Sequence, residues 1–118
     1  GGCATGEARI TNGYDLKARF VIHTVGPVWH GGDHDEALVL AQCYHRALGL
    51  CVGNNLTSIA FPAISTGIYG FPAKLAATIA VQTVSEFLTA DDRLGRVIFC
   101  CFGAASLKAH RDALKAIK

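Results

Sequence analysis

Three nearly uninterrupted apolar runs most constrain what this chain can fold into. They are RFVIHTV (Arg19 to Val25), the run from Thr57 to Ile64, and VIFCCF (Val97 to Phe102). Each is short, rich in β-branched or aromatic residues, and apolar at consecutive positions, which is typical of a strand buried on both faces. A shorter strand, Glu7 to Thr11, precedes them, and Asn12-Gly13 after it predicts a hairpin turn.

Amphipathic helical patterns separate these strands. The first helix has Asp33 as its predicted N-cap and Glu36 as the partner in a capping box, and Gly53 with the two asparagines after it ends the helix. The second helix begins with Pro72 at its first position and runs to about Thr89. The last covers Ala104 to Lys118, with predicted inward residues Leu107, His110, Leu114 and Ile117.

The order strand, strand, helix, strand, helix, strand, helix predicts an α/β fold. We expect a three-layer α/β/α sandwich with a mixed, mostly parallel sheet. The chain has 118 residues, of which 51% are hydrophobic, so one domain over residues 1–118 has apolar surface enough for a core. The chain opens at Gly1-Gly2 and contains no methionine. We therefore expect a fragment, a processed product or a trimmed form, incomplete at its N-terminus.

The small net charge neither demands nor excludes a polyanionic partner. The net charge is only +2 and no long Lys/Arg run is present, so non-specific binding to nucleic acid is not expected. No apolar run approaches the ~18 residues of a membrane span, and no signal segment opens the chain, so we expect a cytoplasmic protein. The five cysteines read as reduced, core-packed thiols, with one redox-active thiol as the alternative.

The functional signal lies in IAFPAISTGIYGFPAKLAA, Ile59 to Ala77, where a buried strand passes through small residues into a helix. In open α/β sheets, ligands bind beyond the carboxyl ends of the strands. Glycines at positive φ, the helix amino end and hydroxyl groups together favour a phosphate or diphosphate there, and Tyr69 is placed to cover a sugar or base. An ordinary β-α turn is the alternative. The candidate residues are Ser65, Thr66, Gly67, Ile68, Tyr69 and Gly70.

Other polar residues favour structural roles. His30 and His34 stand beside Asp33 and Asp35 in a spacing that suits a metal, but the segment reads as a solvated loop, so no metal site is expected. His23 lies inside an apolar strand, where a buried histidine bonded to a backbone carbonyl is favoured over a catalytic base. No catalytic residue and no cofactor is assigned.

Three long segments, in the right order, resemble the macro domains, which are ADP-ribose-binding α/β modules. IAFPAISTGIYGFP resembles their second ligand loop, GEARITNGYDLKARFVIHTVGPVW their preceding hairpin and strand, and RVIFCCF their last core strand. The resemblance implies that the loop from Ser65 to Gly70 wraps the diphosphate of ADP-ribose, with Tyr69 near the distal ribose. It also implies that Phe102 stacks on the adenine. The segments that carry the family's first, Asn-containing ligand loop have no counterpart in the chain.

The resemblance further implies an activity and two kinds of partner. Relatives read ADP-ribose or hydrolyse ADP-ribosyl esters, such as O-acetyl-ADP-ribose and mono-ADP-ribosylated side chains, with an oriented water in place of a covalent nucleophile. Because a sheet without a central strand leaves open edges, the chain is expected to pair with a complementing N-terminal segment or to form a dimer. Alternatives from other classes are a non-catalytic interaction fragment and a general nucleotide- or RNA-binding module.

Overall fold

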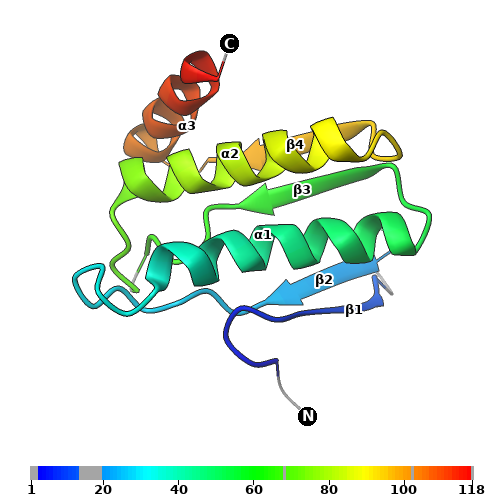
Figure 1. Cartoon of the computed structure of the whole chain (residues 1–118), viewed down its shortest axis with the longest axis horizontal. Coiled ribbons are helices and arrows are strands. Elements are labelled where there is room, and N and C mark those ends of the chain that lie inside the picture. Colours follow the sequence, from blue (N-terminus) through cyan, green and yellow to red (C-terminus); the bar gives the residue numbers. More distant parts are fainter. Residues whose placement is uncertain (1–2, 14–19, 68, 102, 118) are drawn as a thin grey trace.

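A computed structural model describes residues 3–13, 20–67, 69–101 and 103–117 of the chain. Strands and helices follow one another in the predicted order (Figure 1). Their bounds are β1 Ala8–Asn12, β2 Phe20–Thr24, α1 Glu36–Gly53, β3 Ser58–Pro62, α2 Ala73–Ala90, β4 Arg96–Cys100 and α3 Ala104–Ala116. The prediction of an α/β fold with a parallel sheet component is confirmed.

The described strands form two separate pairs. β1 runs antiparallel to β2, with Asn12 opposite Phe20, and β3 runs parallel to β4, with Ile59 opposite Val97. Because Asn12 still pairs within β1, the predicted two-residue turn at Asn12-Gly13 is wrong. The connection is longer, and most of it lies outside the described residues. The arrows of β2, β3 and β4 point the same way in Figure 1, as parallel strands joined by helical crossovers require.

Burial on both faces was predicted for the strands, and this prediction is wrong for the described structure. In β3, Phe61 is buried and Ile59 half-buried, but Ser58 and Ala60 are exposed. In β4, Ile98 is 40% exposed. Side chains alternate between the two faces of a strand, and Ile59, Val97 and Phe99 are the ones packed against the core cluster that α1 and α2 contribute to. The described helices therefore cover one face.

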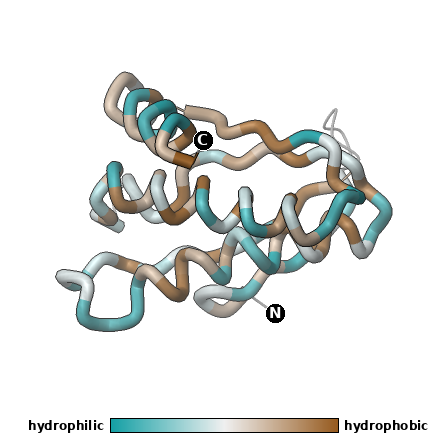
Figure 2. Tube along the Cα trace, turned by 45° about the horizontal axis from the view of Figure 1, so that its top comes forward, coloured by the Kyte–Doolittle hydropathy of each residue, from teal (hydrophilic) through white to brown (hydrophobic). Residues whose placement is uncertain are grey.

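Helix α1 supplies the centre of the core. Its buried residues recur at three- and four-residue spacing, and the ring of Tyr44 packs edge-on against Phe61 with centroids 4.9 Å apart. The same helix contacts β1, β2 and β3, so it lies beneath both strand pairs. Figure 2 shows hydrophobic and hydrophilic residues alternating along the helices, as one buried face requires.

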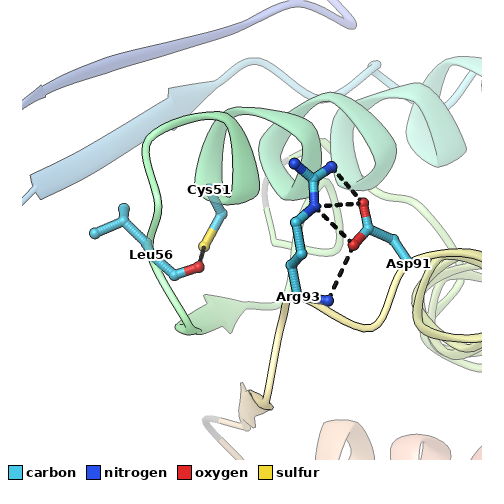
Figure 3. Close-up of polar contacts among 4 residues, drawn as sticks. All are labelled: Cys51, Leu56, Asp91 and Arg93. Carbon is cyan, nitrogen blue, oxygen red and sulfur yellow. Dashed lines mark hydrogen bonds and ion pairs between the residues drawn. The ribbon is translucent and has the colours of Figure 1, made fainter.

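Two turns at the amino ends of β3 and β4 are closed by specific contacts (Figure 3). After α1 ends at Gly53, as predicted, the Cys51 thiol lies 3.9 Å from the Leu56 carbonyl oxygen. After α2, the Arg93 guanidinium donates to the Asp91 carboxylate at 2.6 Å. These hydrogen bonds lower the pKa of Asp91 to about 2. The two turns fix where each parallel strand begins.

Helix α3 is attached less firmly than its apolar pattern predicts. His110 and Ala113 are buried, whereas Leu107, Leu114 and Ile117 are exposed. The prediction of inward-facing side chains is therefore wrong for three of the four residues. Ala113 packs with Ala77 and Val81 of α2 in a small cluster that Phe99 also contacts. Helix α3 packs against α2 through this small cluster, and most of the apolar side chains of α3 stay exposed. Within the described part of the chain, no helix is long and apolar enough to cross a membrane.

We expect Leu48→Ala to lower the free energy of unfolding by ~2–5 kcal/mol, because a fully buried leucine leaves a cavity. Leu38→Ala on the same helix is the matched control. Leu38 is 59% exposed, so its loss should stay within about 0.5 kcal/mol. Urea unfolding of both variants measures the difference. Equal losses would contradict the assignment of the buried face of α1.

Candidate functional site

The loop after β3 folds back on itself. The Gly70 N–H donates to the Gly67 carbonyl at 3.1 Å, and the Phe71 N–H donates to the Ser65 carbonyl at 2.9 Å. Gly70 has φ +75°, as predicted for a glycine of this loop, and a Cβ at Gly70 or Gly67 would meet no described residue beyond its chain neighbours within 4 Å. The positive φ predicted for Gly67 is wrong, and Ser65 adopts it instead, with φ 67°. The loop is therefore open to a ligand on its glycine side.

Helix α2 points its amino end at this loop. Pro72 is the N-cap and Ala73 the first helical residue, one position later than predicted, and no side chain caps the end. The first backbone N–H groups of a helix have no acceptor within the helix, and they carry the positive end of its dipole. An anion held by the loop would meet these donors.

Ser65 has an unusual position in the loop. Its hydroxyl oxygen is buried and has no hydrogen-bond partner among the described residues. It lies against Gly26, where a Cβ would overlap both Ser65 Oγ and the Ile64 side chain. Gly26 is therefore required for this close approach. A buried hydroxyl without a partner is uncommon in folded proteins and needs an explanation, such as a ligand or a water.

A second loop, after β2, forms the neighbouring wall. The backbone N–H of Trp29 donates to the Tyr69 carbonyl at 2.8 Å. The Trp29 ring packs against Phe71 with centroids 4.8 Å apart, and Phe71 is 2% exposed. Tyr69 keeps 37% of its surface exposed. The ends of β2 and β3 are thus brought together, and the Tyr69 ring stays free to cover a ligand.

Glu36 organises this second loop, and the predicted capping box with Asp33 is wrong. Helix α1 begins at Glu36 with Asp35 as its N-cap, in the left-handed region at φ 58°. The Glu36 carboxylate accepts backbone N–H groups from His30, Gly32 and His34 at 2.8, 3.0 and 2.6 Å. Burial raises its pKa, but these hydrogen bonds outweigh burial and lower the pKa to about 2. The carboxylate is ionised and buried.

A cavity of about 870 Å³ runs from this site between the two strand pairs. All residues of β2 and β3 line it, and Ala47 and Cys51 of α1 lie along it. Ser65 and Tyr69 contribute to the lining, where the strands end. Within the described residues β2 and β3 share no ladder hydrogen bonds, so one edge of each strand faces the cavity.

The structure brings together Ser65, Thr66, Gly67, Tyr69 and Gly70. Ile68 and Phe102 lie outside the described residues, so their roles stay predictions. Gly26, Trp29 and Glu36 were not predicted from the sequence as parts of the site. The available signal for Gly26 and Trp29 was their place shortly after β2, whereas Glu36, the first residue of α1, gave only the capping-box pattern.

Among the described residues, the histidines and cysteines considered as candidates form neither a metal site nor an activated nucleophile. The rings of His30 and His34 meet edge-on at 5.5 Å, and no group of three potential metal ligands occurs in the described residues. His23 is exposed and its Nε2 lies 2.9 Å from Thr11 Oγ1, so its predicted burial is wrong. All five cysteines are free, and burial raises the pKa of Cys43 and Cys51. Neither buried thiol is poised as a nucleophile.

Comparison with known proteins identifies relatives across the chain. The family model described as Macro domain matches residues 1–80. The macro domain-containing protein CT2219 of Chlorobaculum tepidum is 56% identical over 98% of this chain and 67% of its own length. An O-acetyl-ADP-ribose deacetylase of Klebsiella pneumoniae is 54% identical over 97% of this chain and 65% of its own length.

Solved structures of macrodomains have the same fold as this chain. An Oceanobacillus iheyensis macrodomain with ADP superposes with a TM-score of 0.92 at 43% identity, over 97% of this chain and 60% of that one. A Trypanosoma brucei macrodomain in complex with ADP-ribose gives 0.89 at 39% identity, over 96% of this chain and 47% of that one. The chain thus spans about two thirds of the length of the curated relatives that it matches, and less of the solved ones.

The lowered pKa of the buried Glu36 carboxylate predicts how the stability of the fold changes at acid pH. The pKa of Glu36 is about 2 in the folded chain against an ordinary value of 4.5, so folding favours its ionised form. The resulting stabilisation is present above pH 4.5 and is lost as the pH falls through about 2. We expect Glu36→Gln to be less stable than the parent at pH 6, with the difference shrinking towards pH 2. Urea midpoints at each pH measure this.

The parent-minus-variant difference removes the contribution of Asp91, whose pKa is also lowered to about 2. A difference that stayed constant over the whole pH range would contradict a role for the Glu36 charge.

Proposed function

Because the chain belongs to the macro domain family, we propose that its loop from Ser65 to Gly70 binds the diphosphate of ADP-ribose or of an ADP-ribose derivative. The observation that carries this proposal is the open face of the loop. Among the described residues other than each glycine's chain neighbours, no atom lies within 4 Å of a Cβ at Gly67 or Gly70, and the amino end of α2 follows directly. Backbone donors then hold the anion, so no lysine or arginine is required.

Two side chains fit the same ligand. The buried Ser65 hydroxyl lacks a partner among the described residues, and a diphosphate oxygen would supply an acceptor for it. The half-exposed ring of Tyr69 stands between Gly67 and Gly70 in the sequence and would lie against the distal ribose. Supporting this choice, structures of an Oceanobacillus iheyensis macrodomain with ADP and a Trypanosoma brucei macrodomain with ADP-ribose share the fold.

For the complete polypeptide we propose hydrolysis of ADP-ribosyl esters, such as O-acetyl-ADP-ribose or mono-ADP-ribosylated side chains. The support is the 54% identity to an O-acetyl-ADP-ribose deacetylase. The raised pKa of Cys43 and Cys51 argues against a thiolate nucleophile at either position. An oriented water, placed by the bound diphosphate, suits the hydroxyl and backbone donors of this site.

We expect Gly67→Val to weaken ADP-ribose binding at least ~10-fold, because the valine side chain would occupy the proposed diphosphate site. The fold should persist, since a Cβ at Gly67 meets no atom within 4 Å among the described residues beyond its chain neighbours. Gly49→Val is the matched control, because Gly49 is exposed on α1 and its Cβ also meets nothing. Calorimetric titration with ADP-ribose compares the three proteins. Unchanged affinity in Gly67→Val would refute the loop assignment.

We also propose that an extended segment from outside these 118 residues fills the cavity between β2 and β3. Both strands border the cavity along their whole length, and both run in the same direction (Figure 1). A parallel strand added there would pair with both edges. Ala47 and Cys51 beneath it leave room for small or apolar side chains. The additional length of the relatives is a source for such a segment.

Hydrogen exchange tests this second proposal. Amides of β3 should exchange faster in the 118-residue chain than in a polypeptide that includes the natural flanking residues, because an edge facing a cavity lacks ladder bonds. Protection that rises with the concentration of the 118-residue chain would show a second copy in the cavity instead. Equal protection in all cases would exclude a strand at this position.

A further inference from the structure

We propose that Glu36 is a positioning residue for the ligand loop, acting through Trp29. Its carboxylate lies outside that loop, on the first residue of α1. A chain of direct contacts nevertheless joins it to Tyr69 and Phe71. The inference rests on the proposed function only in that the loop from Ser65 to Gly70 is the part that holds the ligand.

The first link is between the carboxylate and the preceding loop. Glu36 is 1% exposed, and its two oxygens accept N–H groups from alternate residues, His30, Gly32 and His34. The backbone therefore curls around one buried charge. This curl needs positive φ at Gly31 and Gly32, which have φ of +91° and +95°. Hydrogen bonds to an ionised acceptor are stronger than those between neutral groups, so they favour one conformation of this loop.

The second link is between this loop and Trp29. The Trp29 ring folds over Gly32, where a Cβ would lie 3.1 Å from the ring atom Cη2. The shape that Glu36 imposes at Gly32 thus sets how far the indole can move. A loop that relaxed away from the carboxylate would remove the surface on which the ring lies.

The third link is between Trp29 and the ligand loop. The Trp29 N–H donates to the Tyr69 carbonyl at 2.8 Å, and its ring packs on Phe71 at 4.8 Å. Phe71 in turn donates its N–H to the Ser65 carbonyl at 2.9 Å. Trp29 therefore contacts the carboxyl end of the ligand loop directly and the Ser65 end through Phe71, and its own position depends on Glu36. Displacements of about 1 Å in positioned groups can cost ~10²-fold in function.

A role confined to the start of α1 is the competing explanation. In that case, removing the charge would loosen the helix and leave the ligand loop unchanged while the chain stays folded. The two explanations differ in which amides respond. Leu48 reports the interior of α1, whereas the N–H of Phe71 reports the closure of the ligand loop.

The test compares Glu36→Gln with Asp33→Asn, which removes the same charge from an exposed side chain of the same loop. Hydrogen exchange without ligand is followed at Phe71 and Leu48, and calorimetry measures ADP-ribose affinity. We expect Glu36→Gln to speed exchange at Phe71 at least ~10-fold relative to Leu48, and to weaken ADP-ribose binding by ~10-fold or more. Asp33→Asn should match the parent in both measurements.

Trp29→Ala is the second variant, in case Glu36→Gln does not fold. It removes the intermediate ring and leaves the carboxylate with its three donors, so it should also speed exchange at Phe71. Unchanged exchange at Phe71 in a folded Glu36→Gln or Trp29→Ala chain would overturn the inference. Failure of the parent chain to bind ADP-ribose would count against the proposed function alone, because the exchange measurements need no ligand.

Discussion

Helix α1 packs against strands of both pairs, and this packing holds β2 and β3 at a fixed spacing although the described residues show no ladder bonds between them. The buried side chains of Leu40, Tyr44, Leu48 and Cys51 provide the contact surface. Hydrophobic burial is not directional, so it sets a distance without setting a register. The carboxyl ends of the two strands are then aligned by their loops, where Trp29 contacts Tyr69.

The alignment of the two loops would let a chain of small net charge hold the highly charged ligand that we propose. The proposed donors are backbone N–H groups and the amino end of α2, and their positions are fixed by the fold. A cradle of this kind needs space more than charge, which is why Gly26, Gly67 and Gly70 matter. Rigidity comes from buried partners such as Phe71, so the donors need little reordering when a ligand arrives.

Periodicity predicted the order of the elements, the end of α1 at Gly53 and the place of the loop between β3 and α2, because each depends on neighbouring residues. It failed where distant residues decide. Glu36 was assigned to a local capping box, but the double-glycine turn brings three other N–H groups to it. Apolar runs predicted strands correctly and their burial wrongly, because a run cannot show which face the helices cover. The burial predicted for the apolar side of α3 was too high for the same reason, because Leu107 and Leu114 are exposed.

We propose that the loop after β3 is a diphosphate cradle. The most direct measurement is an NMR titration of the ¹⁵N-labelled chain with ADP-ribose, with AMP as the control ligand. For ADP-ribose we expect large, saturable shifts of the backbone amides of Thr66, Gly67 and Gly70 and of the first residues of α2, with much smaller shifts for AMP. Shifts confined to other regions, or equal shifts with both ligands, would contradict it.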